Sequence, residues 1–238
     1  MEKINQLKKF LNTFNLDGYI IPKNDEFFGE YIPANKDRLK FISNFTGSYG
    51  FALILKNKNY LFVDGRYTLQ AKIQSGRLFN IITIPNKFPS DVLKNKKLKI
   101  GFDPKLHTQN NLKSFFKKTE CKLITIKQNL IDNLWKQNKH HKFKKFFIMP
   151  EKAVGQDYKL KINKLVKILK NKKIDLHFIS ASENVAWLLN IRGQDSNFTP
   201  MPNSYLAVSR DKKIILFCDL RKINSHFKKK FRNIEIID

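Results

Sequence analysis

The chain has few of the residues that carry redox or metal chemistry. Its 238 residues include two cysteines, Cys121 and Cys218, and five histidines. The cysteines lie in separate strand-like segments without the short spacing of a zinc site, so we expect two buried free thiols. This usage is typical of a cytoplasmic protein and argues against a fold that depends on disulfides.

Long hydrophobic runs are absent as well. No apolar stretch approaches the roughly 18 residues that a membrane-spanning helix needs, and residues 1–10 lack the apolar core of a secretory signal. Hydrophobic residues still make up 42% of the chain, with 21 Phe among them. That content is enough for packed cores, so we expect ordered cytoplasmic domains.

Acidic residues are scarce: 20 stand against 46 Lys and Arg, which gives a formal charge of +26. Only seven of the basic residues are Arg, and the lysines are spread over nearly every predicted helix and turn. Nucleic-acid surfaces favour localised arginines. The chain is also rich in Asn, Ile and Phe, whose codons are AT-rich, so biased base composition explains the lysines equally well. The charge predicts weak, salt-sensitive association with polyanions and no specific nucleic-acid partner.

The sequence contains an internal duplication. A Lys-rich amphipathic helix precedes DGYIIP at residues 17–22 and a similar helix precedes IDLHFI at 174–179; NFTG at 44–47 corresponds to NIRG at 190–193. DGRY at 64–67 likewise corresponds to DLRK at 219–222. The element order holds while loop lengths vary, which predicts two related domains rather than a solenoid.

Periodicity predicts an α/β fold with mixed sheets flanked by helices in both copies. The predicted domains are residues 1–127, a connector at 128–155 with a polar run at 136–145, and a second copy at 156–238. Trp187 is predicted to be a core residue of a helix at 182–189. The second copy lacks the two strands and the helix that follow Ile84 in the first, so we expect it to be incomplete, with an open sheet edge or face.

The order of motifs DGYIIP, EYIP at 30–33, FTGS at 45–48 and DGRY at 64–67 resembles the N-terminal domain of Xaa-Pro aminopeptidases of the creatinase/prolidase type. The resemblance continues through AWLLNIRG at 186–193 into a second domain, as in three-domain, cytosolic-type members. It implies a metallopeptidase that releases an N-terminal residue preceding proline. In the family a C-terminal pita-bread domain holds two divalent metals, often manganese, through two Asp, two Glu and one His. Paired metals activate a bridging water.

No metal ligands and no catalytic residues are predicted within these 238 residues. His107, His140, His141, His177 and His226 form no HExxH-like pair and have no neighbouring cluster of carboxylates. Each is expected to be a surface or core histidine with ordinary hydrogen bonding. The chain alone is therefore not expected to hydrolyse peptides, and its expected partners are the catalytic domain, a peptide substrate and a second subunit.

Arg66 is the one residue to which the resemblance gives a role, which is substrate binding beside the catalytic domain. Its guanidinium suits a peptide carbonyl or carboxylate, and the alternative is a salt bridge within its own turn. Because Asp64 and Arg66 recur as Asp219 and Arg221, helix capping by Asp64 is expected to be architectural.

Two loops complete the candidates. Gly47, Ser48 and Gly50 are expected to pack against the following hairpin. Arg192 and the loop around Pro200–Pro202 either face the catalytic domain or form an ordinary surface. Two other functions stay open: an interaction module without hydrolase activity, and a weak nonspecific polyanion binder.

Overall fold

The computed structural model describes residues 1–135 and 144–238, and its contacts divide the chain into two compact units. The first comprises Met1–Glu26 and Ala34–Asn138, and the second Phe27–Pro33 and Lys139–Asp238. Most of the predicted polar run at 136–145 lies outside the described residues, as do His140 and His141. None of the described helices is both long and apolar enough to cross a bilayer.

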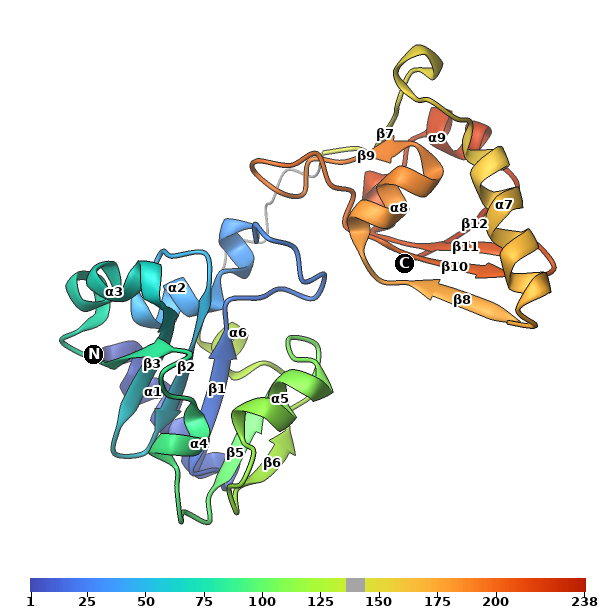
Figure 1. Cartoon of the computed structure of the whole chain (residues 1–238). Helices are drawn as coiled ribbons and strands as arrows, with labels where there is room; N and C mark the ends of the chain where they lie inside the picture. Colours follow the sequence, from blue (N-terminus) through green and yellow to red (C-terminus); the bar gives the residue numbers. More distant parts are fainter. Residues whose placement is uncertain (136–143) are drawn as a thin grey trace. The chain divides into compact units, whose positions relative to one another are not determined.

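The first unit is built on a six-stranded mixed sheet in the order β4-β3-β2-β1-β5-β6 (Figure 1). Its strands are β1 (Gly18–Pro22), β2 (Gly50–Leu55), β3 (Asn59–Asp64), β4 (Asn80–Ile84), β5 (Lys99–Phe102) and β6 (Lys122–Thr125). The strands β1, β2 and β3 pair antiparallel, while β4 joins β3 and β5 joins β1 in parallel.

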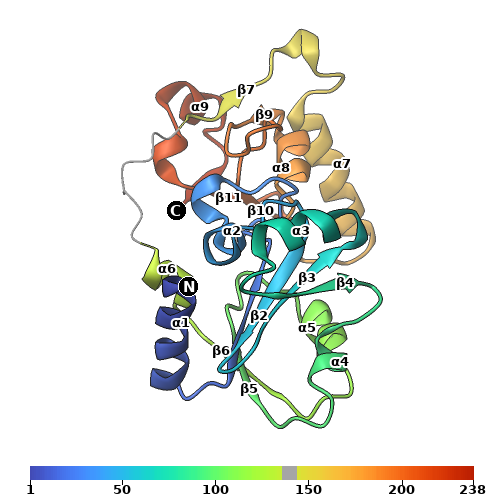
Figure 2. The ribbon, with the colours of Figure 1, turned by 90° about the vertical axis from the view of Figure 1, so that its left-hand side faces the viewer.

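Helices cover both faces of this sheet (Figure 2). They are α1 (Glu2–Thr13), α2 (Arg38–Ser43), α3 (Thr68–Ser75), α4 (Pro89–Val92), α5 (Gln109–Phe115) and α6 (Leu130–Leu134). One core cluster joins α1, α2, α3 and α6 to one face. A second cluster includes Leu112 of α5 and Leu93, which directly follows α4, against the other face. The amphipathic spacing of α1, which buries Ile4, Leu7 and Leu11, explains its place on the sheet.

The second unit repeats this plan with fewer strands. Its sheet has the order β12-β11-β10-β8, with β8 (Leu176–Ile179), β10 (Tyr205–Ser209), β11 (Ile214–Phe217) and β12 (Glu235–Ile237). As in the first unit, three strands pair antiparallel and the fourth joins in parallel. Beside it lie the short pair β7 (Phe147–Ile148) and β9 (Ile191–Arg192), with helices α7 (Tyr158–Asn171), α8 (Ser182–Leu189) and α9 (Ser225–Lys230). The predicted fold, two related α/β units of which the second is incomplete, is confirmed.

A segment from early in the sequence belongs to the second unit. The Phe27 ring stacks on Tyr205 with ring centroids 5.0 Å apart, and the Tyr31 ring meets Phe198 edge-on at the same distance. The Ser196 hydroxyl donates to the Tyr31 carbonyl at 3.1 Å. Nothing in the hydrophobic pattern of residues 27–33 predicts this placement, because the partner residues are far away in the sequence.

The prediction that Trp187 is a core residue is wrong, because its side chain is 62% exposed. The buried stripe of α8 is formed by Val185, Ala186, Leu188 and Leu189. Trp187 therefore lies on the opposite side, where the Lys161 ammonium sits 4.4 Å from the centroid of its ring. Of the two predicted buried thiols, Cys218 is buried and Cys121 is only partly so.

Candidate functional site

The turn after β3 holds the one predicted site residue. A single 3-10 turn, Gly65–Tyr67, precedes α3, and Asp64 caps it. The Asp64 Oδ1 accepts hydrogen bonds from the Arg66 backbone N–H at 3.0 Å and from its Nε–H at 2.8 Å. The predicted N-cap is therefore confirmed. The Arg66 side chain, through this hydrogen bond, lowers the pKa of the Asp64 carboxyl below its usual value.

The hydrogen bond from Nε–H holds the Arg66 guanidinium in place, and its two terminal nitrogens remain accessible. The side chain is 72% exposed, and its terminal nitrogens make no hydrogen bond to any of the described residues. The guanidinium carbon lies 5.4 Å from the centroid of the Tyr67 ring, and the Tyr67 hydroxyl is hydrogen-bonded to Ser48 Oγ at 2.8 Å. A guanidinium held in this way can present two parallel N–H donors to a carbonyl or carboxylate.

The equivalent turn in the second unit is closed differently. Asp219 caps Arg221 through the same backbone contact at 3.0 Å. Arg221, however, donates from Nε to Asp219 Oδ1 and from Nη2 to Asp219 Oδ2, both at 2.8 Å. Its guanidinium therefore forms a bidentate pair with that carboxylate. The cap is common to both units and is architectural, whereas the open edge of the guanidinium distinguishes Arg66.

In the loop that precedes β2, Gly50 packs against the following hairpin as predicted, whereas Gly47 packs against Phe45 of the same loop. A Cβ at Gly47 would lie 2.3 Å from Phe45 Cζ, and one at Gly50 would lie 2.7 Å from the Phe62 carbonyl oxygen. Both positions therefore require glycine for close packing. Through Ser48 and Tyr67, this loop also supports the turn that carries Arg66.

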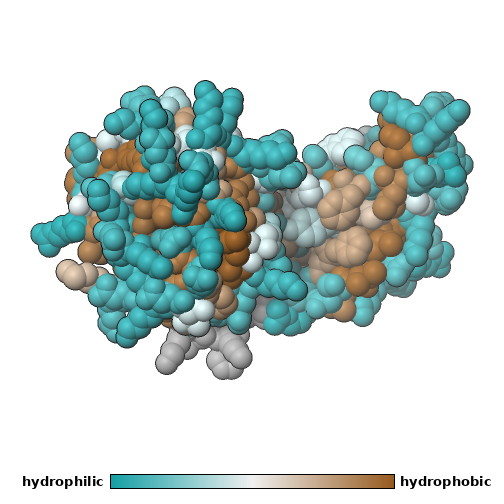
Figure 3. Space-filling view, turned by 90° about the horizontal axis from the view of Figure 1, so that it is seen from below, coloured by the Kyte–Doolittle hydropathy of each residue, from teal (hydrophilic) through white to brown (hydrophobic). Residues whose placement is uncertain are grey.

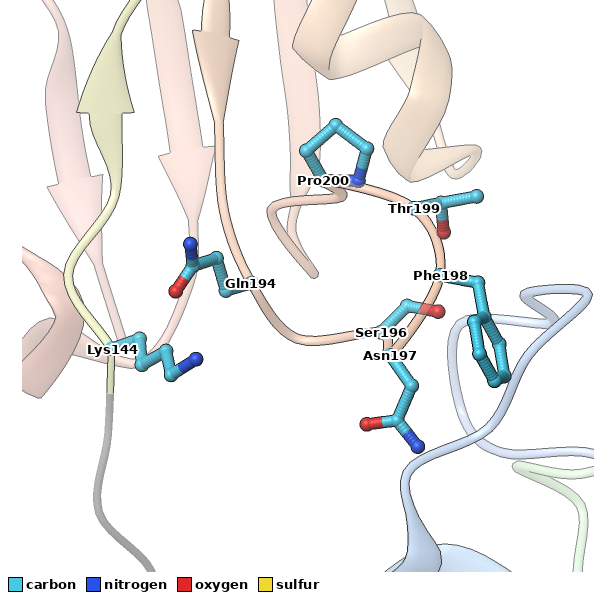
Figure 4. Close-up of a pocket in the computed structure, with 7 residues that line it drawn as sticks. All are labelled: Lys144, Gln194, Ser196, Asn197, Phe198, Thr199 and Pro200. Carbon is cyan, nitrogen blue, oxygen red and sulfur yellow. The ribbon is translucent and has the colours of Figure 1, made fainter.

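A shallow hollow of about 340 Å³ lies in the second unit at the loop after β9 (Figure 4). It is lined by Lys144, Gln194, Ser196, Asn197, Phe198, Thr199 and Pro200. Lys144 and Gln194 stand on one side of the loop, and the strongly exposed Phe198 points away on the other. The lining is mainly polar, and Lys144 supplies its charge.

The loop is held in place from beneath. Asp195 pairs with Lys222 at 2.7 Å, with both side chains largely buried, and accepts a hydrogen bond from the Asn203 backbone at 2.8 Å. Gly193 has no room for a Cβ, which would lie 2.6 Å from the Met201 carbonyl oxygen. Arg192 donates to the Ala186 and Ile191 carbonyls, so the structure holds its guanidinium against α8.

No group of three or more potential metal ligands occurs among the described residues. His177 and His226 are exposed. His107 is buried, and its Nε2 has no hydrogen-bond partner among the described residues, which differs from the satisfied core histidine that we expected. Burial lowers the pKa of His107 to about 4.

No local sequence pattern indicates the buried ion pair that Arg38 forms in the first unit. Arg38 of α2 is 2% exposed and forks onto Asp132, with Nε–Oδ1 at 2.7 Å and Nη2–Oδ2 at 2.8 Å. The same Nη2 contacts Glu26 Oε1 at 3.0 Å. Burial alone raises the pKa of the Glu26 carboxyl, but Lys36 and Arg38 outweigh it and bring that pKa below its usual value.

These features define two α/β units with related sheet topology. Residues 3–134 and residues 137–238 each match a family model described as the creatinase/prolidase N-terminal domain. The chain belongs to this family.

Several proteins that are similar to this chain are longer than it is. Xaa-Pro aminopeptidase 1 of Dictyostelium discoideum is 32% identical over 95% of this chain but only 39% of its own length. A probable Xaa-Pro aminopeptidase P of Laccaria bicolor is 30% identical over 94% of this chain and 36% of its own. The crystal structure of the X-prolyl aminopeptidase of Caenorhabditis elegans, described as a cytosolic enzyme with a di-nuclear active site, superposes with a TM-score of 0.90 at 26% identity. The superposed region covers 99% of this chain and 42% of the Caenorhabditis elegans enzyme. The chain thus spans about two fifths of these relatives.

Proposed function

We propose that this chain is the non-catalytic N-terminal portion of an Xaa-Pro aminopeptidase and acts in the cytoplasm. Its role is to restrict access to the active site, to contribute Arg66 to substrate binding and to help subunits associate. The hydrolysis itself belongs to a C-terminal catalytic domain, whose two divalent metals, manganese by resemblance, would activate water. The family membership and the shared length with named aminopeptidases support this proposal.

The orientation of Arg66 is the observation that carries the proposed binding role. A solvent-facing arginine ordinarily loses much side-chain entropy when it binds a ligand. Asp64 removes part of that cost in advance, because it holds Nε at 2.8 Å while the side chain stays 72% exposed. In this role Asp64 is a positioning residue, and Arg66 is the group that meets the peptide.

The experiment joins residues 1–238 to the remainder of the Dictyostelium relative, so that the chain replaces the matching N-terminal part. We expect this chimera to hydrolyse a peptide with proline at its second position when Mn²⁺ is present. We expect residues 1–238 alone to be inactive. Hydrolysis by residues 1–238 alone would overturn the assignment as a non-catalytic portion.

In the chimera, Arg66→Ala is expected to lower kcat/KM roughly ten- to hundredfold, the loss typical of a charged hydrogen bond to substrate. The thermal midpoint should stay unchanged because the side chain is exposed. Arg221→Ala is the matched control: it removes the same residue type from the same kind of turn, and activity should persist. Unaltered kinetics for Arg66→Ala, or an equal loss for Arg221→Ala, would remove the substrate role from Arg66.

A further inference from the structure

The outer side of α3 carries two strongly exposed aliphatic side chains. Leu69 is 72% exposed and Ile73 is 77% exposed. Apart from Met1, no large hydrophobic side chain described in the first unit is more exposed than these two. Ala71 of the same helix is buried in the core, so α3 has distinct inner and outer sides. In Figure 2, α3 lies at the front of the first unit, and no other element of that unit lies in front of it.

Exposure alone does not mark a site, because single apolar side chains are common on protein surfaces. Figure 3 shows apolar surface scattered between hydrophilic side chains on the face that it presents. The informative feature of Leu69 and Ile73 is their spacing from Arg66. They follow it by three and seven residues, which places all three side chains on one side of a helical segment. With a rise of about 1.5 Å per residue, Leu69 lies about 5 Å and Ile73 about 10 Å along the axis from Arg66.

The second unit offers a comparison for this surface. The helix that follows its capped turn is α9, and the exposed residues of α9 are all polar: Ser225, His226 and Lys228–Lys230. The guanidinium of Arg221 is also paired with both oxygens of its own carboxylate. An accessible guanidinium and an exposed aliphatic pair therefore occur together in the first unit, and neither occurs at the equivalent place in the second. Because capping of the turn requires neither feature, their joint presence indicates a shared role.

Hydrogen bonds hold α3 against the loop that precedes β2. Gln70 Nε2 and Gln74 Nε2 donate to Thr46 Oγ1 at 2.7 and 2.9 Å, and the Thr46 N–H donates to Gln74 Oε1 at 2.9 Å. At the end of the helix, Ser75 Oγ donates to the Ser43 carbonyl at 2.7 Å. The exposed pair is therefore presented on a fixed element, which lowers the entropic cost of binding a ligand there.

We propose that Arg66, Leu69 and Ile73, called here the α3 face, bind the part of a peptide substrate that follows its proline. Arg66 takes a carbonyl or carboxylate of the peptide, and the two aliphatic residues contact an apolar side chain. The inference rests on the substrate role proposed for Arg66. The favoured substrates are then peptides with apolar residues after the proline.

The dimensions of an extended peptide fit this arrangement. Such a peptide advances about 3.3 Å per residue, so the roughly 5 to 10 Å between Arg66 and the aliphatic pair corresponds to two or three residues. In the proposed function, cleavage takes place between the first residue and the proline at the metals of the catalytic domain. The residues after the proline are therefore the ones that can reach the α3 face.

A protein partner is the competing occupant, and the size of the surface argues against it. Two aliphatic side chains supply on the order of 200 Å² of apolar area. A specific protein–protein interface covers about 800 Å² on each partner. Leu69 and Ile73 therefore match one or two side chains of a ligand better than they match a subunit.

The test uses the chimera described above and two tetrapeptides that begin with the same residue and proline. One peptide carries leucine at its third and fourth positions, and the other carries serine at both. We expect the chimera to prefer the leucine peptide. Introducing Leu69→Ser and Ile73→Ser together should lower the ratio of the two kcat/KM values roughly tenfold. The loss should appear in KM with kcat unchanged, because a contact remote from the reacting atoms is the same in the ground state and the transition state.

Leu160→Ser is the matched control, because it removes an aliphatic side chain that is 53% exposed on α7. It should leave the ratio unchanged. Arg66→Ala should lower kcat/KM for both peptides, which separates the binding role of Arg66 from the selectivity of the aliphatic pair. The dissociation constants of the two peptides give a second measure of the ratio that does not depend on turnover.

A ratio that survives the double replacement, or an equal loss on both peptides, would overturn the selectivity of the α3 face and leave the role of Arg66 intact. A changed oligomeric state in the double variant would assign the α3 face to a subunit contact and would also overturn it. A chimera that binds neither peptide would contradict the proposed function itself, and the inference would fall with it.

Discussion

Arg38→Met is expected to destabilise the first unit by about 3 to 5 kcal/mol, the usual cost of breaking a buried ion pair. Methionine keeps most of the apolar volume of the arginine stem, so the loss reports the charge and its hydrogen bonds. Two forked hydrogen bonds to Asp132 and one to Glu26 disappear together. The Glu26 carboxyl would then remain largely buried with one fewer cation beside it. Urea denaturation, followed by a probe in the first unit, measures the change.

Lys36→Met is the matched control for this prediction. Lys36 also pairs with Glu26, at 3.2 Å, but its side chain is far more exposed than that of Arg38. An exposed pair contributes about 0 to 1 kcal/mol, so this variant should denature close to the unchanged protein. A loss below about 1 kcal/mol for Arg38→Met would show that the pair is not a stabilising element of the unit.

Acid should destabilise the protein through His107. The folded-state pKa is depressed to about 4, whereas an unfolded histidine titrates near 6.5. Below pH 6.5 the unfolded chain therefore binds a proton that the folded chain does not. Stability falls as the pH drops from about 6.5 to about 4 and then levels off with respect to this group. A shift of this size corresponds to roughly 3 kcal/mol.

His107→Leu isolates that contribution, because leucine cannot take up a proton. The absolute stability at pH 7 also changes, since the backbone hydrogen bond to Ile20 is lost. The informative quantity is the difference between variant and unchanged protein, which should shift by roughly 3 kcal/mol in favour of the variant between pH 7 and pH 4. Parallel pH profiles for His107→Leu and the unchanged protein would contradict the prediction.

The main helices and strands of both units could be predicted from the sequence, because the patterns that indicate them are local. The helix at α1 follows from apolar residues at helical spacing, and the hairpin β2-β3 from two β-rich runs joined by a short polar turn. The cap by Asp64 was predictable because its partner is two residues away. The internal duplication also helped, because a feature that recurs in both units, such as the aspartate cap, can be attributed to the architecture.

Features that depend on distant partners were not predictable in this way. Arg38 and Asp132 are 94 residues apart, and nothing near either residue marks them as a pair. The short helices α2 and α9 have too few turns to establish a clear period. Trp187 was placed in the core from its apolar neighbours, but α8 buries a narrow stripe and the indole falls outside it. The sheet face of the second unit that lacks helices was expected only in outline, because its residues can be assigned only once the registers of β8, β10 and β11 are known.

The asymmetry between the two capped turns has a consequence for how repeats diverge. One carboxylate oxygen is enough to hold each turn, since the backbone and Nε contacts of Arg66 both end on Asp64 Oδ1. The fold of the turn therefore does not require hydrogen bonds from the two terminal nitrogens of the arginine. In the second lobe they reinforce the turn locally, while in the first they remain available to another molecule. A repeated module can in this way acquire a recognition group without giving up any contact that its own architecture requires.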